Sequence, residues 1–257
     1  MYANYHTHTK RCRHASGEDR EYVEAAIEAG IKILGFSDHC PWIYPNEFMS
    51  RIRMMPQELE GYIDSLSRLR DEYADDIKIL IGLEAEYVPE LMDAQNRFLG
   101  QYPLDYMILG QHFLGQEDTS QYMGAPTSDL QLLQQYVDSV IVGMKSGKYR
   151  YLAHPDLINF IGNQKMYRRA MRRLLEFLKE GGYPIEINML GAVQERNYPN
   201  ETFLELAREI GNQVIIGVDA HSPEQLNNPE GELLCMELAQ GLEIVYDLPG
   251  GEHRNGK

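Results

Sequence analysis

Polar imidazoles recur at regular points along this chain, in or just after short apolar runs of the kind that form β-strands. Seven of the eight histidines follow this pattern, and three acids accompany them. Core packing gives no reason for such placement, whereas neutral imidazole and carboxylate are the usual protein ligands of Zn, Fe and Mn. The pattern therefore predicts a multinuclear metallohydrolase. The residues are His6, His8, His14, His39, His112, His154 and His221, with Asp38, Glu84 and Asp219.

Two of these groups have the spacing of a strand. His6 and His8 are two residues apart, so both side chains leave one face of a strand and can grip one ion. Alone, such a pair would fit solvent-facing histidines equally well. Asp219 and His221 repeat the spacing at the end of the last predicted strand, which is a neighbour of the first strand in a closed barrel. The two pairs together favour a metal site.

The remaining candidates each have a competing interpretation. Glu84 ends a five-residue apolar run, where a buried carboxylate is unfavourable unless it is paired or metal-bound. Glu86 shares its orientation, but we expect Glu86 to face solvent. His112 and His154 also follow apolar runs and fit the same convergence. His14 falls in a predicted loop, where a surface histidine is the alternative.

Seven strand-like runs must position these residues. Several are almost continuously apolar, as in a parallel sheet covered on both faces, and amphipathic helical patterns alternate with them. This alternation fits an open doubly wound sheet or a closed barrel. Only a closed barrel brings all strand ends to one face, so the polar strand ends favour an α/β fold of the TIM-like (β/α)7 barrel type. The runs are 2–8, 32–39, 77–87, 105–113, 150–155, 184–189 and 213–221.

Length and composition agree with one such domain. The 257 residues match the roughly 250 that a barrel needs, and we see no linker or repeat, so we predict a single domain over 1–257 with a frayed tail at 249–257. Cys12, Cys40 and Cys235 are too few and scattered for a disulfide framework. We find no signal sequence and no apolar run of membrane-spanning length, so we expect a cytoplasmic protein without a membrane partner.

The motifs, taken in order, resemble those of the PHP (polymerase and histidinol phosphatase) superfamily. The resemblance runs from His6 to Ser222 and implies a distorted seven-stranded barrel that holds a trinuclear metal site. The motifs are His6-Thr7-His8, Asp38-His39, Gly82-Leu83-Glu84, a lone His112, Ala153-His154-Pro155 and Gly217-Val218-Asp219-Ala220-His221-Ser222.

The resemblance also implies a ligand set for three divalent ions, of which Zn, Fe and Mn are all candidates. Every ligand position of the family is filled in this sequence. The first ion would be held by His6, His8, Glu84 and Asp219. Glu84 would bridge to a second ion completed by His112 and His154, and the third would take His14, His39 and His221.

The chemistry implied is phosphoester hydrolysis. A hydroxide that bridges two metal ions is a strong nucleophile near neutral pH, and it would attack phosphorus in line. We assign Glu84, Asp219 and His221 to the catalytic set. Asp38 would either orient an imidazole or act as an acid. The net charge of −15 argues against a long nucleic acid, but three divalent ions would make the pocket locally cationic and suited to a small phosphorylated substrate.

Within the superfamily, the segments 13–19 and 36–41 are most similar to the histidinol-phosphate phosphatase branch. The implied reaction converts L-histidinol phosphate and water to L-histidinol and phosphate, a step of histidine biosynthesis. One alternative is a PHP phosphoesterase for nucleotides or phosphotyrosine. Another is a non-catalytic metal-binding scaffold. An amidohydrolase is disfavoured, because His112 stands where that class carries a lysine.

Contacts with substrate are harder to predict. Arginine binds phosphate through paired hydrogen bonds, and Arg196 is the first candidate and Arg168 the second. Glu186 and Asn188 share a strand face and would either bind the substrate's ammonium group or support the site. The long loops 40–56 and 113–128 are expected to shape the pocket. The sequence leaves the oligomeric state open.

Overall fold

The computed structural model describes residues 1–249. The predicted frayed tail therefore lies outside the described residues except for Pro249, and so does His253. No helix within residues 1–249 is long and apolar enough to cross a membrane.

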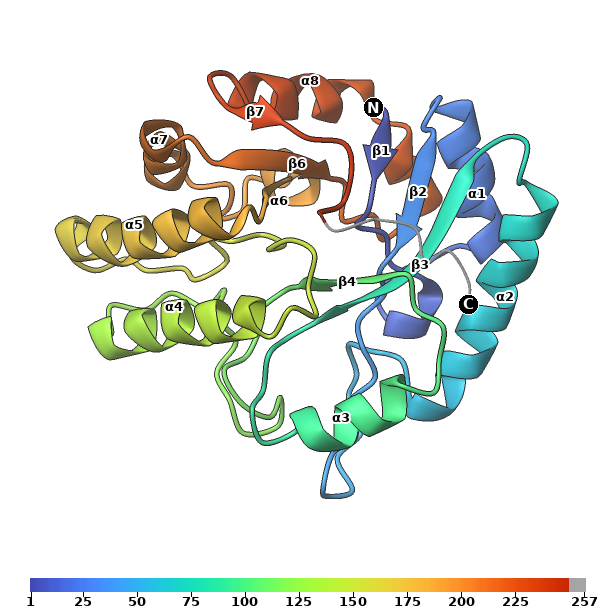
Figure 1. Ribbon diagram of the computed structural model, residues 1–257, viewed down its shortest axis with the longest axis horizontal. Helices are drawn as coiled ribbons and strands as arrows, with labels where there is room; N and C mark the ends of the chain where they lie inside the picture. Colours follow the sequence, from blue (N-terminus) through green and yellow to red (C-terminus); the bar gives the residue numbers. More distant parts are fainter. Residues whose placement is uncertain (250–257) are drawn as a thin grey trace.

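A curled parallel sheet forms the centre of the molecule, with helices outside it (Figure 1). Its strands pair in two groups, in which every pairing is parallel. The first group is β1 (Ala3–Asn4), β2 (Ile33–Phe36), β3 (Lys78–Ala85) and β4 (Tyr106–Leu109). The second is β5 (Ile185–Asn188), β6 (Gln213–Gly217) and β7 (Glu243–Ile244). All carboxyl ends within each group therefore point the same way.

Isolated bridges link the two groups. Leu152 pairs with both Leu109 and Ile185, and Thr7 pairs with Ala220 beyond the ends of β1 and β6. Six of the seven predicted strands are present within residues 1–249, in shorter form. The segment 150–155 lies where the remaining strand was predicted, but it forms bridges only at Leu152. A positive φ of 26° at His154 ends its extended backbone. β7 was not predicted. The prediction of an α/β fold with a parallel sheet is confirmed.

The helices cover the outer face of the sheet (Figure 1). Amphipathic stripes within 133–144 and 171–178 form the buried faces of α4 (Leu130–Lys145) and α5 (Gln164–Gly181). Asp129 and Asn163 cap these helices by accepting backbone N–H groups of the first turn. The helices are α1 (Asp19–Glu28), α2 (Leu59–Glu72), α3 (Met92–Leu99), α4 (Leu130–Lys145), α5 (Gln164–Gly181), α6 (Met189–Val193), α7 (Glu201–Ile210) and α8 (Pro229–Leu238), with short 3-10 turns at Lys10–Cys12, Pro56–Glu58 and Pro223–Leu226.

Apolar side chains fill both faces of the sheet. The larger cluster lies between strands and helices, and a smaller one gathers side chains from β1, β2, β4, β6 and the segment 150–155. Within the smaller cluster, the Tyr106 hydroxyl donates to the carbonyl oxygens of Tyr5 at 2.8 Å and Phe36 at 3.0 Å. These apolar layers leave the carboxyl ends of the strands as the place where polar side chains collect.

Candidate metal centre

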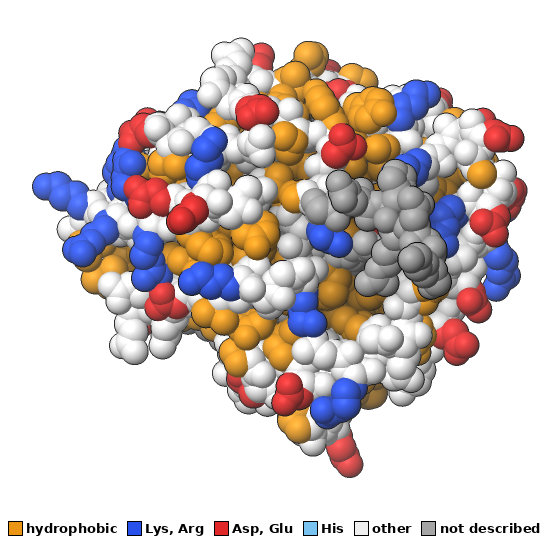
Figure 2. All heavy atoms as spheres, viewed as in Figure 1, with side chains coloured by type: hydrophobic (Ala, Val, Ile, Leu, Met, Phe, Trp, Pro, Cys, Tyr) orange, Lys and Arg blue, Asp and Glu red, His pale blue; other side chains and the backbone are white. Residues whose placement is uncertain are grey.

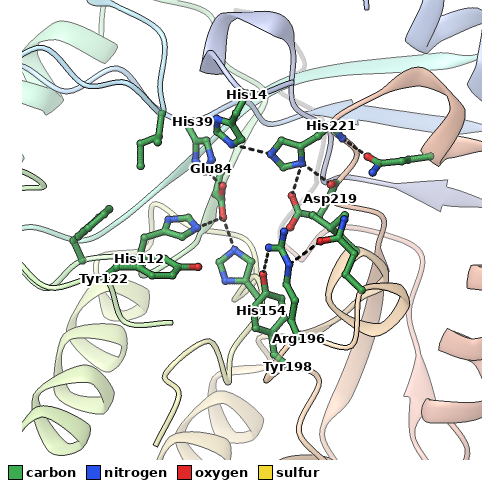
Figure 3. Close-up of a pocket in the computed structure, with 15 residues that line it drawn as sticks. His14, His39, Glu84, His112, Tyr122, His154, Arg196, Tyr198, Asp219 and His221 are labelled. Carbon is green, nitrogen blue, oxygen red and sulfur yellow. Dashed lines mark hydrogen bonds and ion pairs between the residues drawn. The ribbon is translucent and has the colours of Figure 1, made fainter. Parts of the chain in front are cut away.

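All nine predicted metal ligands gather at the carboxyl ends of the strands. Figure 3 shows those that line the pocket, with Glu84 and Asp219 among them. Six of them are at most 6% exposed, namely His6, His8, His39, Glu84, His154 and Asp219. They come from segments as far apart in sequence as β1 and β6, so the parallel arrangement of the strands is what brings them together.

Glu84, near the end of β3, lies in the middle of the cluster. Its Oε1 lies 2.7 Å from His154 Nε2 and 3.5 Å from His112 Nε2, and its Oε2 lies 2.9 Å from His39 Nδ1. A Cβ atom at Gly110 would lie 2.0 Å from Glu84 Oε1, so only glycine leaves room for this carboxylate. Glu84 therefore presents one oxygen to His154 and His112 and the other to His39.

His6, His8 and Asp219 form a compact group beside Glu84. Asp219 Oδ1 lies 3.5 Å from His6 Nε2 and 3.0 Å from His8 Nε2, and each imidazole Nε2 lies 3.6 Å from an oxygen of Glu84. Ligands about 2.0–2.1 Å from a tetrahedral zinc lie about 3.4 Å from one another. The spacing of this group therefore fits a shared ion.

His14, His39 and His221 form a second compact group. The Nε2 atoms of His14 and His221 lie 3.0 Å apart, while their Nδ1 atoms lie 2.8 Å from the carbonyl oxygen of Cys12 and 2.9 Å from that of Asp219. His14 is exposed, as a loop histidine would be, yet its Nε2 atom points toward His221 and into the site. Among residues 1–249, His112 belongs to none of the compact groups and meets the cluster through Glu84.

Unsatisfied buried atoms concentrate in this cluster. Of the seven buried side-chain nitrogen and oxygen atoms that lack a hydrogen-bond partner in the described part of the chain, six belong to His6, His8, His39, Glu84 and His154. Buried polar atoms are normally paired, because desolvation without a partner is unfavourable. Divalent cations would satisfy those that face the cluster, among them His6 Nε2, His8 Nε2 and Glu84 Oε2, so the residues fit a metal centre.

The electrostatics of the cluster point the same way. Burial acts to raise the pKa of Glu84, but the surrounding histidines outweigh it and hold that pKa well below the usual value. Asp219 has a similarly lowered pKa for the same reason. Burial, together with the charge of His8, lowers the pKa of His221 to about 3. Ionised carboxylates and neutral imidazoles are the forms that bind metal.

His6 and His8 behave differently. Burial acts to lower the pKa of His6, but Glu186, Asp219 and Glu84 together raise it well above the usual value. His8 has a raised pKa through Asp219 and Asp38, again against the effect of burial. Protonation of these two imidazoles would therefore compete with metal binding, because a metal ion binds the neutral form.

Three of the predicted ligand imidazoles also have a carboxylate next to Nδ1. Glu186 Oε1 lies 2.8 Å from His6 Nδ1, and Glu86 Oε1 lies 3.1 Å from His112 Nδ1. Asp38 Oδ1 lies 3.4 Å from His8 Nδ1, which supports the orienting role for Asp38 and assigns it to His8. Such partners fix the ring and raise its basicity as a ligand.

The expectation that Glu86 faces solvent is wrong. Its side chain is 1% exposed and pairs with Arg53, which is equally buried. The strand periodicity that aims Glu84 at the site also turns Glu86 inward, two residues further along. The buried partner on the 40–56 loop gave no signal in the sequence.

Glu186 and Asn188 support the site and do not line the pocket. Glu186 also accepts from the backbone N–H of His154 at 2.9 Å. The Asn188 side-chain amide donates to Glu186 at 2.9 Å and to Asp219 at 3.1 Å. Of the two roles predicted for this pair, their burial favours support over contact with substrate.

A pocket of about 480 Å³ lies over the ligands. Arg196, from the loop after α6, faces it and donates to the Tyr198 hydroxyl at 2.8 Å (Figure 3). The two long loops supply Ile52, Phe113 and Tyr122 to the lining of the pocket, as expected. Sequence reasoning missed the two tyrosines, because loop residues follow no period that would indicate where they point.

Arg168 is not brought to the pocket. It lies in α5 and forms ion pairs with Glu205 at 2.9 Å and Glu209 at 3.0 Å, both on α7. Figure 2 shows basic and acidic side chains mixed over this part of the surface. The helical period turns Arg168 outward, away from the strand ends, so the prediction that it binds substrate is not supported.

Comparisons with known proteins point to one family. The family model described as "PHP domain" matches residues 4–189. A protein from Deinococcus radiodurans named "Probable histidinol-phosphatase" is 30% identical over 230 residues, covering 86% of this chain and 86% of that protein. "Histidinol-phosphatase" from Bacillus subtilis is 26% identical over 248 residues, covering 84% of this chain and 92% of its own length.

A solved structure shares the fold. It is the histidinol phosphate phosphatase from Lactococcus lactis, complexed with Zn, L-histidinol and phosphate, with a TM-score of 0.70 at 18% identity and coverage of 95% of each chain. The family match spans well over half of the present sequence. The chain therefore belongs to the PHP domain family.

Proposed function

We propose that this chain is a metal-dependent phosphatase that hydrolyses L-histidinol phosphate to L-histidinol and phosphate. The observation that carries the proposal is a cluster of nine histidine and carboxylate side chains, of the types that bind metal, beneath a pocket whose wall holds an arginine. The names of the relatives from Deinococcus radiodurans and Bacillus subtilis, and the ligands of the Lactococcus lactis structure, support the choice of substrate.

The ligand set is proposed to hold three divalent ions. His6, His8 and Asp219 would take the first together with Glu84, and Glu84 would share the second with His112 and His154. The third would take His14, His39 and His221. Zn, Fe and Mn all suit such donors. When bound, these ions would supply Lewis-acid stabilisation of the charge that develops on the phosphoryl group.

The chain's own residues divide the remaining work. Arg196 is proposed to bind the phosphoryl oxygens, with its guanidinium held by Tyr198 at 2.8 Å and by Gln194 at 3.0 Å. Glu84, Asp219 and His221 make up the proposed catalytic set, because all three face both the ligand cluster and the pocket. Phe113 and Tyr122 are proposed to exclude water from the opposite wall.

The fold proposed for this function is a single domain with a distorted barrel of seven strands. Support comes from the bridges that Leu152 makes to Leu109 and Ile185, and from the pairing of Thr7 with Ala220. A closed ring would hold the segments that follow β1 and β6 side by side. This agrees with the distance of 3.0 Å between His8 Nε2 and Asp219 Oδ1.

Phosphate release from L-histidinol phosphate by the metal-loaded protein tests the proposal. Nucleoside monophosphates and phosphotyrosine belong in the same panel. We expect a kcat/KM of about 10⁴–10⁶ M⁻¹s⁻¹ for histidinol phosphate alone. Slow release from all substrates would overturn the substrate assignment. Metal binding without any release would make the chain a metal-binding scaffold.

A further inference from the structure

Arg53 carries a charge in the interior of the molecule. The residue is 1% exposed and lies on the loop 40–56. Its Nη1 and Nη2 atoms donate to the two oxygens of Glu86 at 3.2 and 3.0 Å, and its Nε donates to Glu117 at 2.8 Å. Because burying a guanidinium and two carboxylates is unfavourable, such a group gives little net stability. A role in positioning the site would explain it.

One arm of this group reaches a metal ligand. The Glu86 carboxylate that Arg53 grips contacts His112 Nδ1 at 3.1 Å, and the opposite nitrogen, Nε2, lies 3.5 Å from Glu84. Trp42 donates its indole N–H to the same carboxylate at 3.0 Å. Arg53 therefore holds the Glu86 carboxylate in place, and Glu86 in turn orients the ring of His112.

The other arm reaches the pocket wall. Glu117 lies on the loop 113–128 and also accepts from the Ser50 hydroxyl at 2.9 Å. Phe113 and Tyr122, on the same loop, line the pocket, and so does Ile52, the neighbour of Arg53. One guanidinium thus joins the two loops whose side chains form this wall.

We propose that Arg53 is a positioning residue with two separable effects: through Glu86 it sets the affinity for the metal ion held by His112, and through Glu117 it sets the shape of the substrate pocket. The first effect needs only that the ligand cluster binds metal. The second rests on the proposed phosphatase function. The two arms are the ion pairs of Arg53 with Glu86 and with Glu117, so a substitution at either carboxylate removes one arm and leaves the other.

Zinc binding to the full chain tests the first arm. Competition with a chromophoric chelator would give the affinity for each equivalent of Zn²⁺. We expect Glu86→Gln and Arg53→Met to lower the affinity for one equivalent of Zn²⁺ by about 10–100-fold. Loss of a carboxylate that hydrogen-bonds to a metal-binding histidine has effects of this size. Glu117→Gln is the matched control and should leave zinc affinity within about twofold. Unchanged zinc affinity in Glu86→Gln would overturn this arm.

Trp42 offers a readout that needs neither metal nor substrate. It is the only tryptophan of the chain, is 4% exposed and donates to Glu86. Arg53→Met should shift its emission to the red and speed its quenching by acrylamide, whereas Glu117→Gln should change it less. Identical emission in all variants would mean that Arg53 does not hold Glu86 in place. If Arg53→Met does not fold, the two single-carboxylate variants decide both arms.

Kinetics at saturating Zn²⁺ test the second arm. Glu117→Gln should raise the KM for L-histidinol phosphate about tenfold with little change in kcat, because the pocket wall is displaced. Glu86→Gln should keep the wild-type KM. An unchanged KM in Glu117→Gln would overturn this arm. If the wild-type chain does not hydrolyse this substrate, the proposed function fails, and the zinc and fluorescence results still decide the first arm.

Discussion

The pocket has a floor, which is the cluster of predicted metal ligands, and a wall, which consists of Arg196 with Tyr198 and the two long loops. The polar atoms of the floor and of the wall find hydrogen-bond partners in opposite ways. On the floor, buried atoms of His6, His8 and Glu84 lack hydrogen-bond partners among residues 1–249. On the wall, the guanidinium of Arg196 is already bonded to Tyr198 and Gln194. The floor is therefore incomplete without cations, whereas the arginine of the wall is already held in place by neighbouring side chains. This difference suggests that the floor determines the chemistry and the wall determines which phosphate ester reacts.

Removing the metal ions should have the largest effect, because the floor depends on them. Treatment with a chelator should abolish phosphate release and destabilise the fold. An ion at a hundred times its Kd stabilises the native state by about 2.7 kcal/mol. Thermal unfolding with and without Zn²⁺ would measure the change, and added Zn²⁺ should restore activity. Full turnover by protein shown to be free of metal would contradict the comparison.

Glu84→Ala attacks the floor at its centre. The carboxylate contacts His39, His112 and His154, so its loss should remove at least one metal equivalent. We expect kcat/KM to fall by about 10³-fold or more. Metal analysis and phosphate release measure the two effects. Glu72→Ala, which removes an exposed acid paired with Arg20, is the control. Wild-type turnover with unchanged metal content would sink the proposed site.

The floor was predictable because strands fix the direction of side chains. Two-residue spacing placed His6 beside His8, and the common direction of parallel strands brought both to Asp219. The same two-residue period turns Glu86 inward, although we predicted that this acid at the end of a strand faces solvent. The segment 150–155 shows the limit, because a run predicted as a full strand forms bridges to its neighbours only at Leu152.

The wall was less predictable because loops carry no period. Arg196 was the first candidate for binding phosphate and Arg168 the second, and the path of the chain separates the two. The loop after α6 turns Arg196 over the ligands, while α5 carries Arg168 to the outer surface. Likewise, the link from Arg53 to Glu117 joins two loops through tertiary contacts that no local pattern encodes.

Arg196→Met tests the wall without touching the floor. Hydrogen bonds to a charged group contribute about 1.5–3 kcal/mol, so KM for histidinol phosphate should rise about 10–100-fold. Metal content should stay at the wild-type value, in contrast to Glu84→Ala. Arg196→Lys, which keeps the charge but not the paired donors, should recover part of the loss. A fall in metal content would mean that floor and wall are not separate.

Asp156→Ala should have a smaller effect on the same wall. The buried Asp156 carboxylate accepts from the backbone N–H of Asn200, and Asn197 donates to the Leu157 carbonyl at 2.9 Å. These contacts hold the turn that carries Arg196. Losing one hydrogen bond of about 0.5–1.5 kcal/mol should raise KM about two- to tenfold. Asp156→Asn keeps an acceptor and should restore most of it. Equal KM values in both variants would mean that this contact does not position Arg196.

Arg168→Ala should have the smallest effect and marks where the wall ends. Its ion pairs with Glu205 and Glu209 are exposed, and such pairs contribute about 0–1 kcal/mol to stability. Because α5 holds the guanidinium away from the pocket, we expect kcat/KM within about twofold of wild type and a loss of unfolding free energy of at most about 1 kcal/mol. Steady-state kinetics and chemical denaturation, run beside Arg196→Met, would measure both. A rise in KM as large as that of Arg196→Met would extend the wall to α5, and the recognition of phosphate would then involve a surface that the present pocket does not include.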